Sequence, residues 1–447
     1  MTKHTYIMHI DGDNFFVACE VARLPHLVGK PVIVGEERGI ASAMSKEAKK
    51  LGVTRGMPIF KIKKEFPQVT ILPAHFDLYQ HYSIRMASVV EKYCDVVEHY
   101  GIDECFGSVT LEIDKNEESF LEDYIRTLQD ELTKTLGISF SIGIARTKTL
   151  AKIASNRNKP RGLCVITEIN REKFLAETPI ESIWGIGRAL SKRLVTSRVG
   201  DAGTFVALPE SIIRTRFTKP TIDTYHELKG IKKIPLEHSS SHRKSLQTTR
   251  MMSPYSSERS FVFSEISRNV EIVCARMRAM NLKSKKITFF IKQVSYHNDR
   301  RSIVSDGREV ELELYTHNPS DIVKSIESIF DQIFDSSKKY HGTGITVHDL
   351  KQTNEIPFDL YSNQENKNQK ESYTQVFDHL RKKFGSYALF IGSSMKSIHF
   401  RNKENDVRTK IRMNTIYHYH ILVKYFDVPN TNSSMSVIYP PRKLLGP

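Results

Sequence analysis

The sequence predicts a mixed α/β protein of several domains, and three observations lead to this prediction. Its 447 residues correspond to about three domains of ordinary size or to one large mosaic. Hydrophobic residues make up 39% of the chain, which is enough for packed cores and excludes disorder along its whole length. Apolar residues recur with strand spacing in some segments of residues 1–165 and with helix spacing in others.

The strand-like and helix-like segments of residues 1–165 alternate along the chain. The expected strands are Tyr6–Ile10, Asp95–Tyr100, Cys105–Ile113 and Ser139–Ile144. The expected helices are Asn14–Ala22, Tyr79–Tyr93, Ser119–Leu136 and Lys148–Ser155. Such alternation is typical of a sheet layered with helices.

The rest of the chain changes character at several points. Short helices are expected over residues 166–232, and the polar linker Leu236–Leu246 marks a domain boundary. A second α/β region follows, with an expected helix over Phe261–Met280 and an expected strand over Lys286–Ser295. Composition predicts a flexible stretch over Gln352–Ser372, before a helix over Gln375–Phe384.

Positive charge is concentrated in residues 242–301. The whole chain has a net charge of +15, and this eighth of it has 13 Lys and Arg against 4 Asp and Glu, so 13 − 4 gives +9. Lysines alternate with apolar residues in the expected strand, which predicts one buried and one cationic sheet face. A cationic face can bind a nucleic-acid backbone by releasing counterions, and the alternative is a solvated basic surface. The candidate DNA-binding residues here are Arg243, Lys244, Arg250, Lys285, Lys286 and Lys292.

Cysteine usage and hydropathy indicate a cytoplasmic protein. The five cysteines are scattered, form no CxxC pair and are odd in number, which argues against disulfides and zinc sites. The N-terminus lacks the apolar core of a signal peptide, and no run of about 18 apolar residues predicts a membrane span.

Carboxylates stand at the ends of expected strands. Asp11 ends the first strand, and Asp103 and Glu104 lie between two others, where a hairpin tip lets both side chains point one way. If these strands are neighbours, three carboxylates converge at a cost in energy unless cations bind. Mg²⁺ suits such oxygen ligands, and two ions about 3.5–4 Å apart would hold the oxygens of an in-line displacement. Gly12 adds a candidate backbone carbonyl ligand. The alternative is a helix cap at Asp11 and a polar turn at Asp103.

At these residues the sequence resembles the Y-family of translesion DNA polymerases. Asp11–Phe16 resembles the first motif of the family, an Asp followed by paired aromatic residues. Gly101–Phe106 is similar to its Ser-Ile-Asp-Glu-Ala-aromatic motif, with Gly for Ser and Cys for Ala. Ser141–Lys152 and Ser182–Gly187 also match, in forms similar to the UmuC branch. The resemblance extends over roughly residues 4–400.

The resemblance implies a right-hand polymerase fold and error-prone, template-directed synthesis from dNTPs in the SOS response to DNA damage. The implied domains are a palm (1–20 and 72–165), fingers (21–71), a thumb with a helix-hairpin-helix (166–232), a little finger (243–350) and a partly flexible extension (351–447). It implies that Asp11 and Asp103 bind the metals and that Glu104 completes the site.

The resemblance also assigns side chains to the incoming nucleotide. Phe16 matches the steric gate that excludes a 2′-hydroxyl, with Phe15 supporting the site from behind; the alternative is ordinary helix packing. Lys148, Lys152 and Lys159 surround the start of a helix that follows a strand, a place that favours the anionic triphosphate. Lys159 matches the triphosphate-binding lysine of the family, and the alternative for Lys148 is a solvated face. Lys49 stands where many members have Arg, so it lacks the planar fork of a guanidinium.

Two further segments resemble binding motifs. Gly185-Ile186-Gly187, followed by Lys192, resembles a DNA-binding helix-hairpin-helix, in which glycines let backbone N–H groups approach a phosphate. Residues 356–361 resemble a degenerate sliding-clamp peptide, and the alternative is a plain linker. Its pocket-filling residues would be Phe358, Leu360 and Tyr361. The resemblance leaves open a UmuD-like accessory protein and a recombinase filament as partners, besides primer-template DNA.

Two other functions compete with a polymerase. A nucleotide cyclase with a similar palm needs no DNA-binding modules, so the Gly185 hairpin and the basic segment count against it. A non-catalytic DNA-binding protein descended from a polymerase would have lost a carboxylate, and all three are present.

Overall fold

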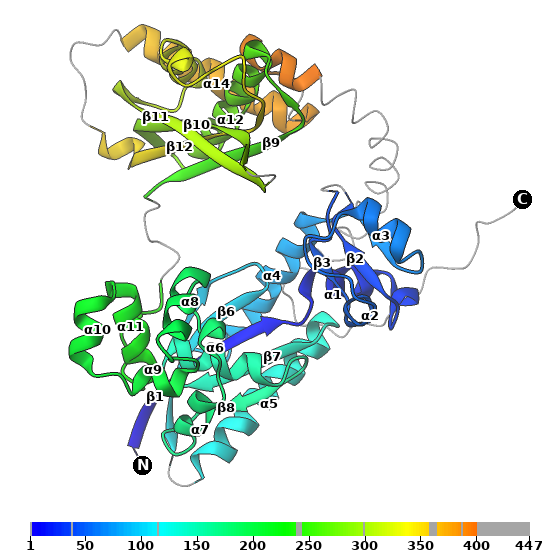
Figure 1. The fold of residues 1–447 in the computed structure, drawn as a ribbon, viewed down its shortest axis with the longest axis vertical. Coiled ribbons are helices and arrows are strands. Elements are labelled where there is room, and N and C mark those ends of the chain that lie inside the picture. The colour runs from blue at the N-terminus through cyan, green and yellow to red at the C-terminus, as the bar shows by residue number, and fades with distance from the viewer. Residues whose placement is uncertain are drawn as a thin grey trace, which may run out of the picture. The chain divides into compact units, whose positions relative to one another are not determined.

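The computed structural model describes residues 2–36, 39–113, 116–237, 244–297, 300–356, 364–385 and 388–399. The chain forms two compact units that divide between residues 241 and 242 (Figure 1). This division falls inside the polar linker that the sequence indicated. Each unit has its own sheet and its own hydrophobic core.

The first unit is built on a five-stranded mixed sheet. In spatial order its strands are β5 (Val96–His99), β6 (Glu104–Ile113), β1 (Thr2–Gly12), β7 (Phe140–Ala145) and β8 (Leu163–Val165). The central strand β1 pairs antiparallel with both β6 and β7, and β7 pairs parallel with β8. The segments expected to be strands therefore meet in one sheet, although β1 extends beyond both ends of its predicted range.

Alternation along β1 separates two faces of this sheet. Tyr6, Met8 and Ile10 face a core shared with three helices. These helices are α1 (Phe15–Arg23), α4 (Phe76–Val90) and α5 (Glu117–Leu136). Ile7 faces the opposite core, which it shares with Leu150 of α6 (Lys148–Arg157). Because side chains alternate with period two, His9 and Asp11 lie on the α6 face with Ile7.

A small second sheet follows α1 in the chain. Its strands are, in spatial order, β3 (Ala43–Met44), β2 (Val32–Val34) and β4 (Thr70–Leu72). The short helices η1 (Pro25–Leu27), α2 (Lys46–Lys50) and α3 (Ile59–Glu65) belong to the same region. Ile33, Met44 and Ile62 lie in its separate hydrophobic core.

Short helices occupy the end of the first unit, as the sequence predicted. They are α7 (Arg171–Ala176), η3 (Ile180–Ser182), α8 (Arg188–Thr196), α9 (Ala202–Val206), α10 (Glu210–Arg216) and α11 (Lys219–Leu228). Leu194, Phe205 and Tyr225 pack in the same core as α6, so these helices are anchored on one face of the large sheet.

The second unit contains a four-stranded antiparallel sheet. Its strands are, in spatial order, β11 (Arg300–Thr316), β10 (Leu282–His297), β12 (Tyr340–Gln352) and β9 (Leu246–Ser256). Ile287, Phe289 and Ile291 of β10 are buried in a core shared with α12 (Arg259–Ala279), α13 (Pro319–Glu327) and η4 (Phe330–Gln332). Lys286 and Lys292 alternate with them and point away from that core, so the predicted two-faced strand is present.

The segment after β12 differs from its prediction. We expected flexibility over 352–372, but η5 (Thr353–Glu355) follows β12 directly and α14 (Gln364–Phe384) begins well before Gln375. Asp378 of α14 pairs with Arg278 of α12 at 2.5 Å. Beyond α14 and η6 (Gly392–Ser394), Ser397 donates a hydrogen bond to Glu265 of α12 at 2.7 Å. Residues 357–363 of the stretch that was expected to be flexible lie outside the described ranges.

Some predicted residues lie outside the described ranges. These are Arg243, the clamp-peptide residues Phe358, Leu360 and Tyr361, and the tail after residue 399. Among the described helices, none combines the length and apolarity needed to cross a membrane.

Candidate metal and nucleotide site

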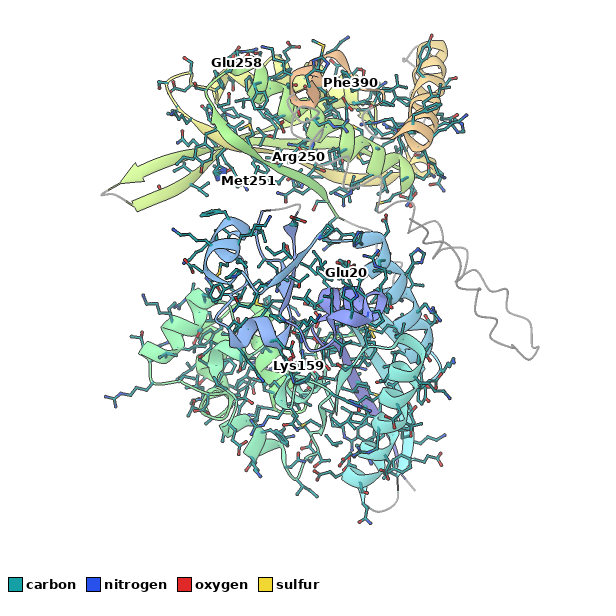
Figure 2. The ribbon with its side chains drawn as sticks, turned by 90° about the vertical axis from the view of Figure 1, so that its right-hand side faces the viewer. Glu20, Lys159, Arg250, Met251, Glu258 and Phe390 are labelled. Atoms are coloured by element: carbon teal, nitrogen blue, oxygen red, sulfur yellow. The ribbon has the colours of Figure 1, made fainter. Side chains whose placement is uncertain are left out.

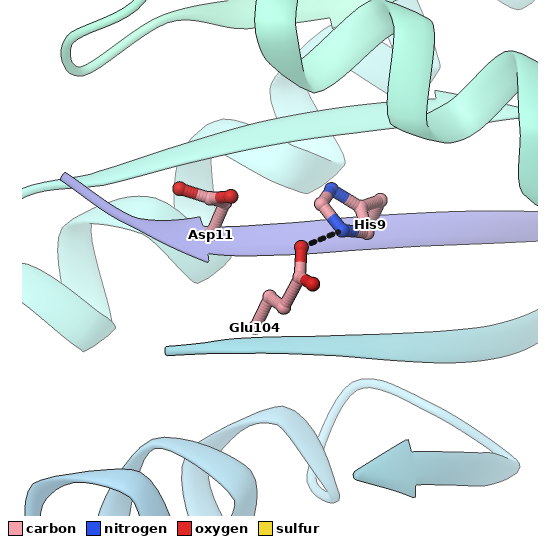
Figure 3. Close-up of side chains that lie close together, drawn as sticks. All are labelled: His9, Asp11 and Glu104. Atoms are coloured by element: carbon pink, nitrogen blue, oxygen red, sulfur yellow. Dashed lines mark hydrogen bonds and ion pairs between the residues drawn. The ribbon is translucent and has the colours of Figure 1, made fainter. Parts of the chain in front are cut away.

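Three potential metal ligands meet where β1 ends and β6 begins. Asp11 and Glu104 are register partners on these strands. His9 Nε2 lies 3.0 Å from Glu104 Oε2, and the ligand atoms of His9, Asp11 and Glu104 all lie within 4.8 Å of one another. Figure 3 shows His9 and Asp11 on one strand, with Glu104 reaching toward them from the next. The structure thus brings together carboxylates that are far apart in the sequence.

The turn before β6 fixes the position of Glu104. Gly101 N donates to Glu104 O at 2.9 Å and closes the hairpin between β5 and β6. Gly12 N donates to Asp103 O at 2.8 Å and joins this turn to the end of β1. A Cβ on Gly12 would lie 2.6 Å from the ring of Phe15, so only glycine fits beside that buried ring.

The Asp103 carboxylate lies beside the group of three ligand atoms and not within it, but interacts electrostatically with Asp11 and Glu104. Its side chain is half-buried in the turn, and the group of three ligand atoms contains His9 in its place. Burial raises the pKa values of Asp11 and Asp103. The negative charge of Asp103 raises the pKa of Asp11 further, and that of Glu104 raises the pKa of Asp103. This is the electrostatic cost that the sequence predicted for converging carboxylates.

His9 is the site residue that sequence reasoning missed. Its ring is fully buried, and Nδ1 lies 2.7 Å from Ser155 Oγ of α6. Burial lowers the pKa of His9, which favours a neutral imidazole. The signal was available, because His9 stands two residues before Asp11 on a strand and so shares its face.

Two lysines neutralise the carboxylates. Lys159 Nζ lies 2.7 Å from Asp11 Oδ1, and Lys152 Nζ lies 2.5 Å from Glu104 Oε2. Burial alone would raise the pKa of Glu104, but hydrogen bonds from His9 and Lys152 lower it to about 2. Both lysines that were predicted to bind the triphosphate therefore lie at the site.

A buried aspartate holds the loop that carries Lys159 (labelled in Figure 2). Asp13 Oδ2 accepts a hydrogen bond from Arg161 N at 2.7 Å, and its Oδ1 accepts from Ser141 Oγ at 2.7 Å. This anchor joins the loop to the end of β1 and to β7. Lys148, in contrast, forms a buried ion pair with Glu98 at 2.8 Å and is neither solvated nor at the site.

Phe15 and Phe16 have different environments. Phe15 is buried in the core, as expected for support from behind. Phe16 is half-buried and stacks on Tyr79, with ring centroids 4.4 Å apart and planes 11° apart. Lys49 of α2 donates to Asn14 Oδ1 at 2.9 Å, so it lies one residue from the Phe15–Phe16 pair.

The segment predicted to be a helix-hairpin-helix has a shorter first helix than expected. Only the single 3₁₀ turn η3 precedes the glycines, and α8 follows them. Gly185 has a φ of +90°, which favours glycine, and no heavy atom lies within 4 Å of a Cβ placed on Gly187. Lys192 is exposed on α8.

The sheet face of the second unit is less cationic than the sequence indicated. Lys286 pairs with Glu309 at 2.8 Å and Lys285 with Glu311 at 3.4 Å, because β11 places glutamates beside the lysines of β10. Lys292 lies 5.5 Å from the ring centroid of Phe290, and Lys244 is exposed before β9. Arg250 lies on β9 (Figure 2).

The site fits divalent cations. Asp11 and Glu104 supply hard oxygen ligands, and the ammonium groups of Lys152 and Lys159 mark two positions where these oxygens already stabilise positive charge. Burial raises the pKa values of Asp11 and Asp103, so a bound cation would stabilise the ionised form of these two groups most.

The comparisons with known proteins identify the family. The impB/mucB/samB family matches residues 10–156, and the C-terminal domain of that family matches residues 243–360. Together these matches cover more than half of the sequence, so the chain belongs to the impB/mucB/samB family.

Relatives and solved structures agree with this membership. A protein of Clostridioides difficile (strain 630) named DNA polymerase IV is 28% identical over 368 residues, covering 80% of this chain and 97% of that protein. The protein of the same name from Streptococcus pyogenes serotype M1 is 27% identical and covers 77% of this chain. A Y-family DNA polymerase chimera built on Dbh matches with a TM-score of 0.63 at 22% identity, covering 77% of this chain and 98% of that one. An insertion ternary complex of Dbh DNA polymerase matches with a TM-score of 0.51 at 20% identity. The fold is therefore that of the Y-family DNA polymerases.

Proposed function

We propose that this chain is a DNA-directed DNA polymerase that synthesises past lesions, joining dNTPs to a primer 3′-hydroxyl with release of diphosphate. The observation that carries the proposal is the register pairing of Asp11 with Glu104, which gathers carboxylates in a chain of this family. The relatives named DNA polymerase IV and the Y-family fold support it.

The metal site is proposed to hold two Mg²⁺ ions. Asp11, Asp103, Glu104 and the Gly12 carbonyl would be the ligands, and such ions stabilise the attacking and leaving oxygens of nucleotidyl transfer. Bound cations would compete with the lysines for these carboxylates. Lys152 and Lys159 would then contact the triphosphate from α6 and from the loop that Asp13 anchors.

Selection of the sugar is proposed for Phe16. Its ring lies flat on Tyr79, and this stacking fixes the plane that a 2′-hydroxyl would meet. Phe15 supports that position from the core, and Lys49 of the second sheet region adds positive charge beside Asn14.

Two surfaces are proposed to bind primer-template DNA. The first comprises Gly185, Gly187 and Lys192, where the open space around Gly187 leaves backbone N–H groups accessible to a phosphate. The second lies in the second unit and comprises Arg243, Lys244, Arg250, Lys285, Lys286 and Lys292. Its paired lysines would exchange glutamate partners for phosphates.

The finer cellular role is proposed from sequence similarity alone. The Trp-Gly-Ile-Gly form resembles the UmuC branch, which supports a cytoplasmic role in the SOS response with a UmuD-like protein and a recombinase filament as partners. Phe358, Leu360 and Tyr361 are proposed to bind a sliding clamp.

A primer-extension assay with and without Mg²⁺ tests the central proposal. Wild-type protein should extend a primer only with the metal, and Asp103→Asn should abolish extension while primer-template binding persists. Asp123→Asn, an exposed change of the same kind on α5, serves as the matched control and should extend normally. Equal extension by Asp103→Asn and wild type would refute the polymerase assignment. DNA binding without extension by the wild type would favour the non-catalytic alternative.

A further inference from the structure

The single tryptophan of the chain joins the Gly185 hairpin to the turn that carries the carboxylates. Trp184 Nε1 donates a hydrogen bond to the Tyr100 hydroxyl at 2.9 Å. Their rings meet edge to face, with centroids 5.5 Å apart and planes 88° apart. Trp184 directly precedes Gly185, and Tyr100 directly precedes the Gly101–Glu104 turn.

Tyr100 in turn contacts a charged group of the candidate metal site. Lys152 Nζ lies 4.9 Å from the centroid of the Tyr100 ring and 2.5 Å from Glu104 Oε2. An ammonium group over an aromatic face is attracted to that ring, so Lys152 is held by Tyr100 and Glu104 together. Phe106 packs behind both aromatic residues, at 5.4 Å from Tyr100 and 5.8 Å from Trp184.

The surroundings allow the indole to move. Trp184, Tyr100 and Gly185 line a cavity of about 670 Å³. Lys219 and Asp223 of α11 line the same cavity and pair with each other at 2.8 Å. Trp184 is half-buried, so its ring has packed neighbours on one side and open space on the other, in contrast to the fully buried Phe106.

We propose that Trp184 and Tyr100 are positioning residues that couple DNA binding at the Gly185 hairpin to cation binding at Asp11 and Glu104. This inference rests on the proposed function. A divalent cation bound to Glu104 repels the ammonium of Lys152, which lies 2.5 Å from Glu104 Oε2, and weakens that contact. A shift of Lys152 changes its cation contact with the Tyr100 ring, and through it the hydrogen bond between Tyr100 and Trp184.

The coupling must act in both directions. A phosphate bound at the hairpin that shifts Trp184 also shifts Tyr100, and this weakens the hold of Lys152 on Glu104. By thermodynamic linkage, DNA then changes the affinity for the cation by the same factor by which the cation changes the affinity for DNA. We expect a factor of about five, the lower end of typical coupling between sites.

The test uses the full chain and its intrinsic fluorescence. Because the chain has one tryptophan, its emission reports only on Trp184. Mg²⁺ is titrated with primer-template DNA ending in a 3′-deoxy primer, and binding is measured in parallel by calorimetry. Wild-type emission should change with the same midpoint as the calorimetric signal. Tyr100→Phe, which keeps the ring and removes the hydroxyl, should bind Mg²⁺ but lose most of the emission change.

A double-mutant cycle supplies the second readout. Trp184→Phe and Tyr100→Phe remove the same hydrogen bond, so each should reduce the Mg²⁺ effect on DNA affinity by about fivefold, and the double variant should show no further loss. Tyr373→Phe, an exposed change on α14, is the matched control and should behave like the wild type.

The outcomes separate the two proposals. Calorimetric Mg²⁺ binding with unchanged emission, or additive effects of the two substitutions, overturns the coupling and leaves the polymerase assignment standing. Absence of both Mg²⁺ binding and primer extension in the wild type overturns the proposed function itself.

Discussion

The carboxylate site of the first unit and the lysine-bearing sheet face of the second unit assemble their charges in different ways. At the site, Asp11, Glu104, Lys152 and Lys159 come from two strands, a helix and a loop, and all four are at least partly buried. On the sheet face, lysines recur along one strand, and Lys286 and Lys285 meet glutamates of its neighbour.

The difference shows where charge is energetically important. Partly buried charges depend on their partners, because removing one partner leaves the other desolvated. Exposed pairs contribute about 0–1 kcal/mol and are screened by salt. Substitutions in the first unit should therefore have large and specific effects, and those on the sheet face should have small effects that depend on ionic strength.

The largest expected effect is that of Asp11→Asn on catalysis. The variant removes one hard oxygen ligand and the partner of Lys159, so the rate of primer extension should fall by roughly 10²–10³-fold or more. Single-turnover extension at saturating dNTP measures it. DNA affinity measured in chelator should change less than about twofold, because the surfaces proposed to bind DNA are intact. Full activity in this variant would contradict the claim that the partly buried charges of the site have larger effects than the exposed charges of the sheet face.

Lys159→Ala should have the next largest effect. Loss of a charge-assisted contact to the triphosphate should raise the KM for dNTP about tenfold or more. Steady-state kinetics at a fixed primer-template concentration measure this. Lys134→Ala, an exposed change on α5, is the control. An unchanged KM would remove Lys159 from the nucleotide site and leave it only as the partner of Asp11.

Phe16→Ala tests whether a stacked ring at the site selects the sugar. The variant should incorporate ribonucleotides, and the preference for dNTP over rNTP should fall by about tenfold or more, since a steric clash is removed. Competition between dNTP and rNTP in primer extension measures the ratio. Phe60→Ala, which removes a largely exposed ring on α3, should leave the ratio unchanged. An unaltered preference in Phe16→Ala would assign its ring to packing on Tyr79 alone.

The sheet face should respond weakly and in the opposite direction. Glu309→Gln frees Lys286 from its partner, so DNA affinity at low salt should rise about twofold to fivefold. The plot of log affinity against log salt concentration should become steeper by up to about one unit, which corresponds to one more released counterion. Fluorescence anisotropy with labelled primer-template over a range of salt concentrations measures both. A decrease in affinity would show that the ion pair itself positions the lysine for DNA.

The smallest effects concern stability without metal, and they have opposite signs at the two carboxylates. Burial raises the pKa of Asp11, so ionisation of this carboxyl group destabilises the fold as pH rises through the raised pKa. The Asp11→Asn variant should therefore have a higher melting temperature than wild type at neutral pH. The pKa of Glu104 is lowered to about 2, so it stabilises the fold above its ordinary value of 4.5 and loses this effect as pH falls toward 2. Glu104→Gln should therefore melt lower than wild type at neutral pH. Melting curves in chelator measure both, and two shifts of the same sign would contradict the electrostatic assignment.

Much of the fold was predictable because it follows from periodicity. The five segments Tyr6–Ile10, Asp95–Tyr100, Cys105–Ile113, Ser139–Ile144 and Lys286–Ser295 all lie in observed strands or overlap them. The carboxylates were predictable because their motifs place them at strand ends. The partner of each charged side chain was not predictable, because it depends on the register in which distant segments pair.

Particular residues show this limit. His9 meets Glu104 because β1 pairs with β6, and Glu309 meets Lys286 because β10 pairs with β11. The helix predicted over Gln375–Phe384 is present as the end of α14, but its ion pair with Arg278, about 100 residues earlier, was not predictable in the same way.

The register between β1 and β6 makes strand length a determinant of activity. Asp11 faces Glu104 because ten consecutive residue pairs, starting at Thr2 and Ile113, keep the two strands in step. One residue inserted in the middle of β6 would turn Glu104 to the opposite face of the sheet, into the hydrophobic core that contains α4 and α5. Two inserted residues would restore its side but displace it along the strand by about 6.6 Å. Insertions and deletions in these two strands should therefore be far less tolerated than substitutions.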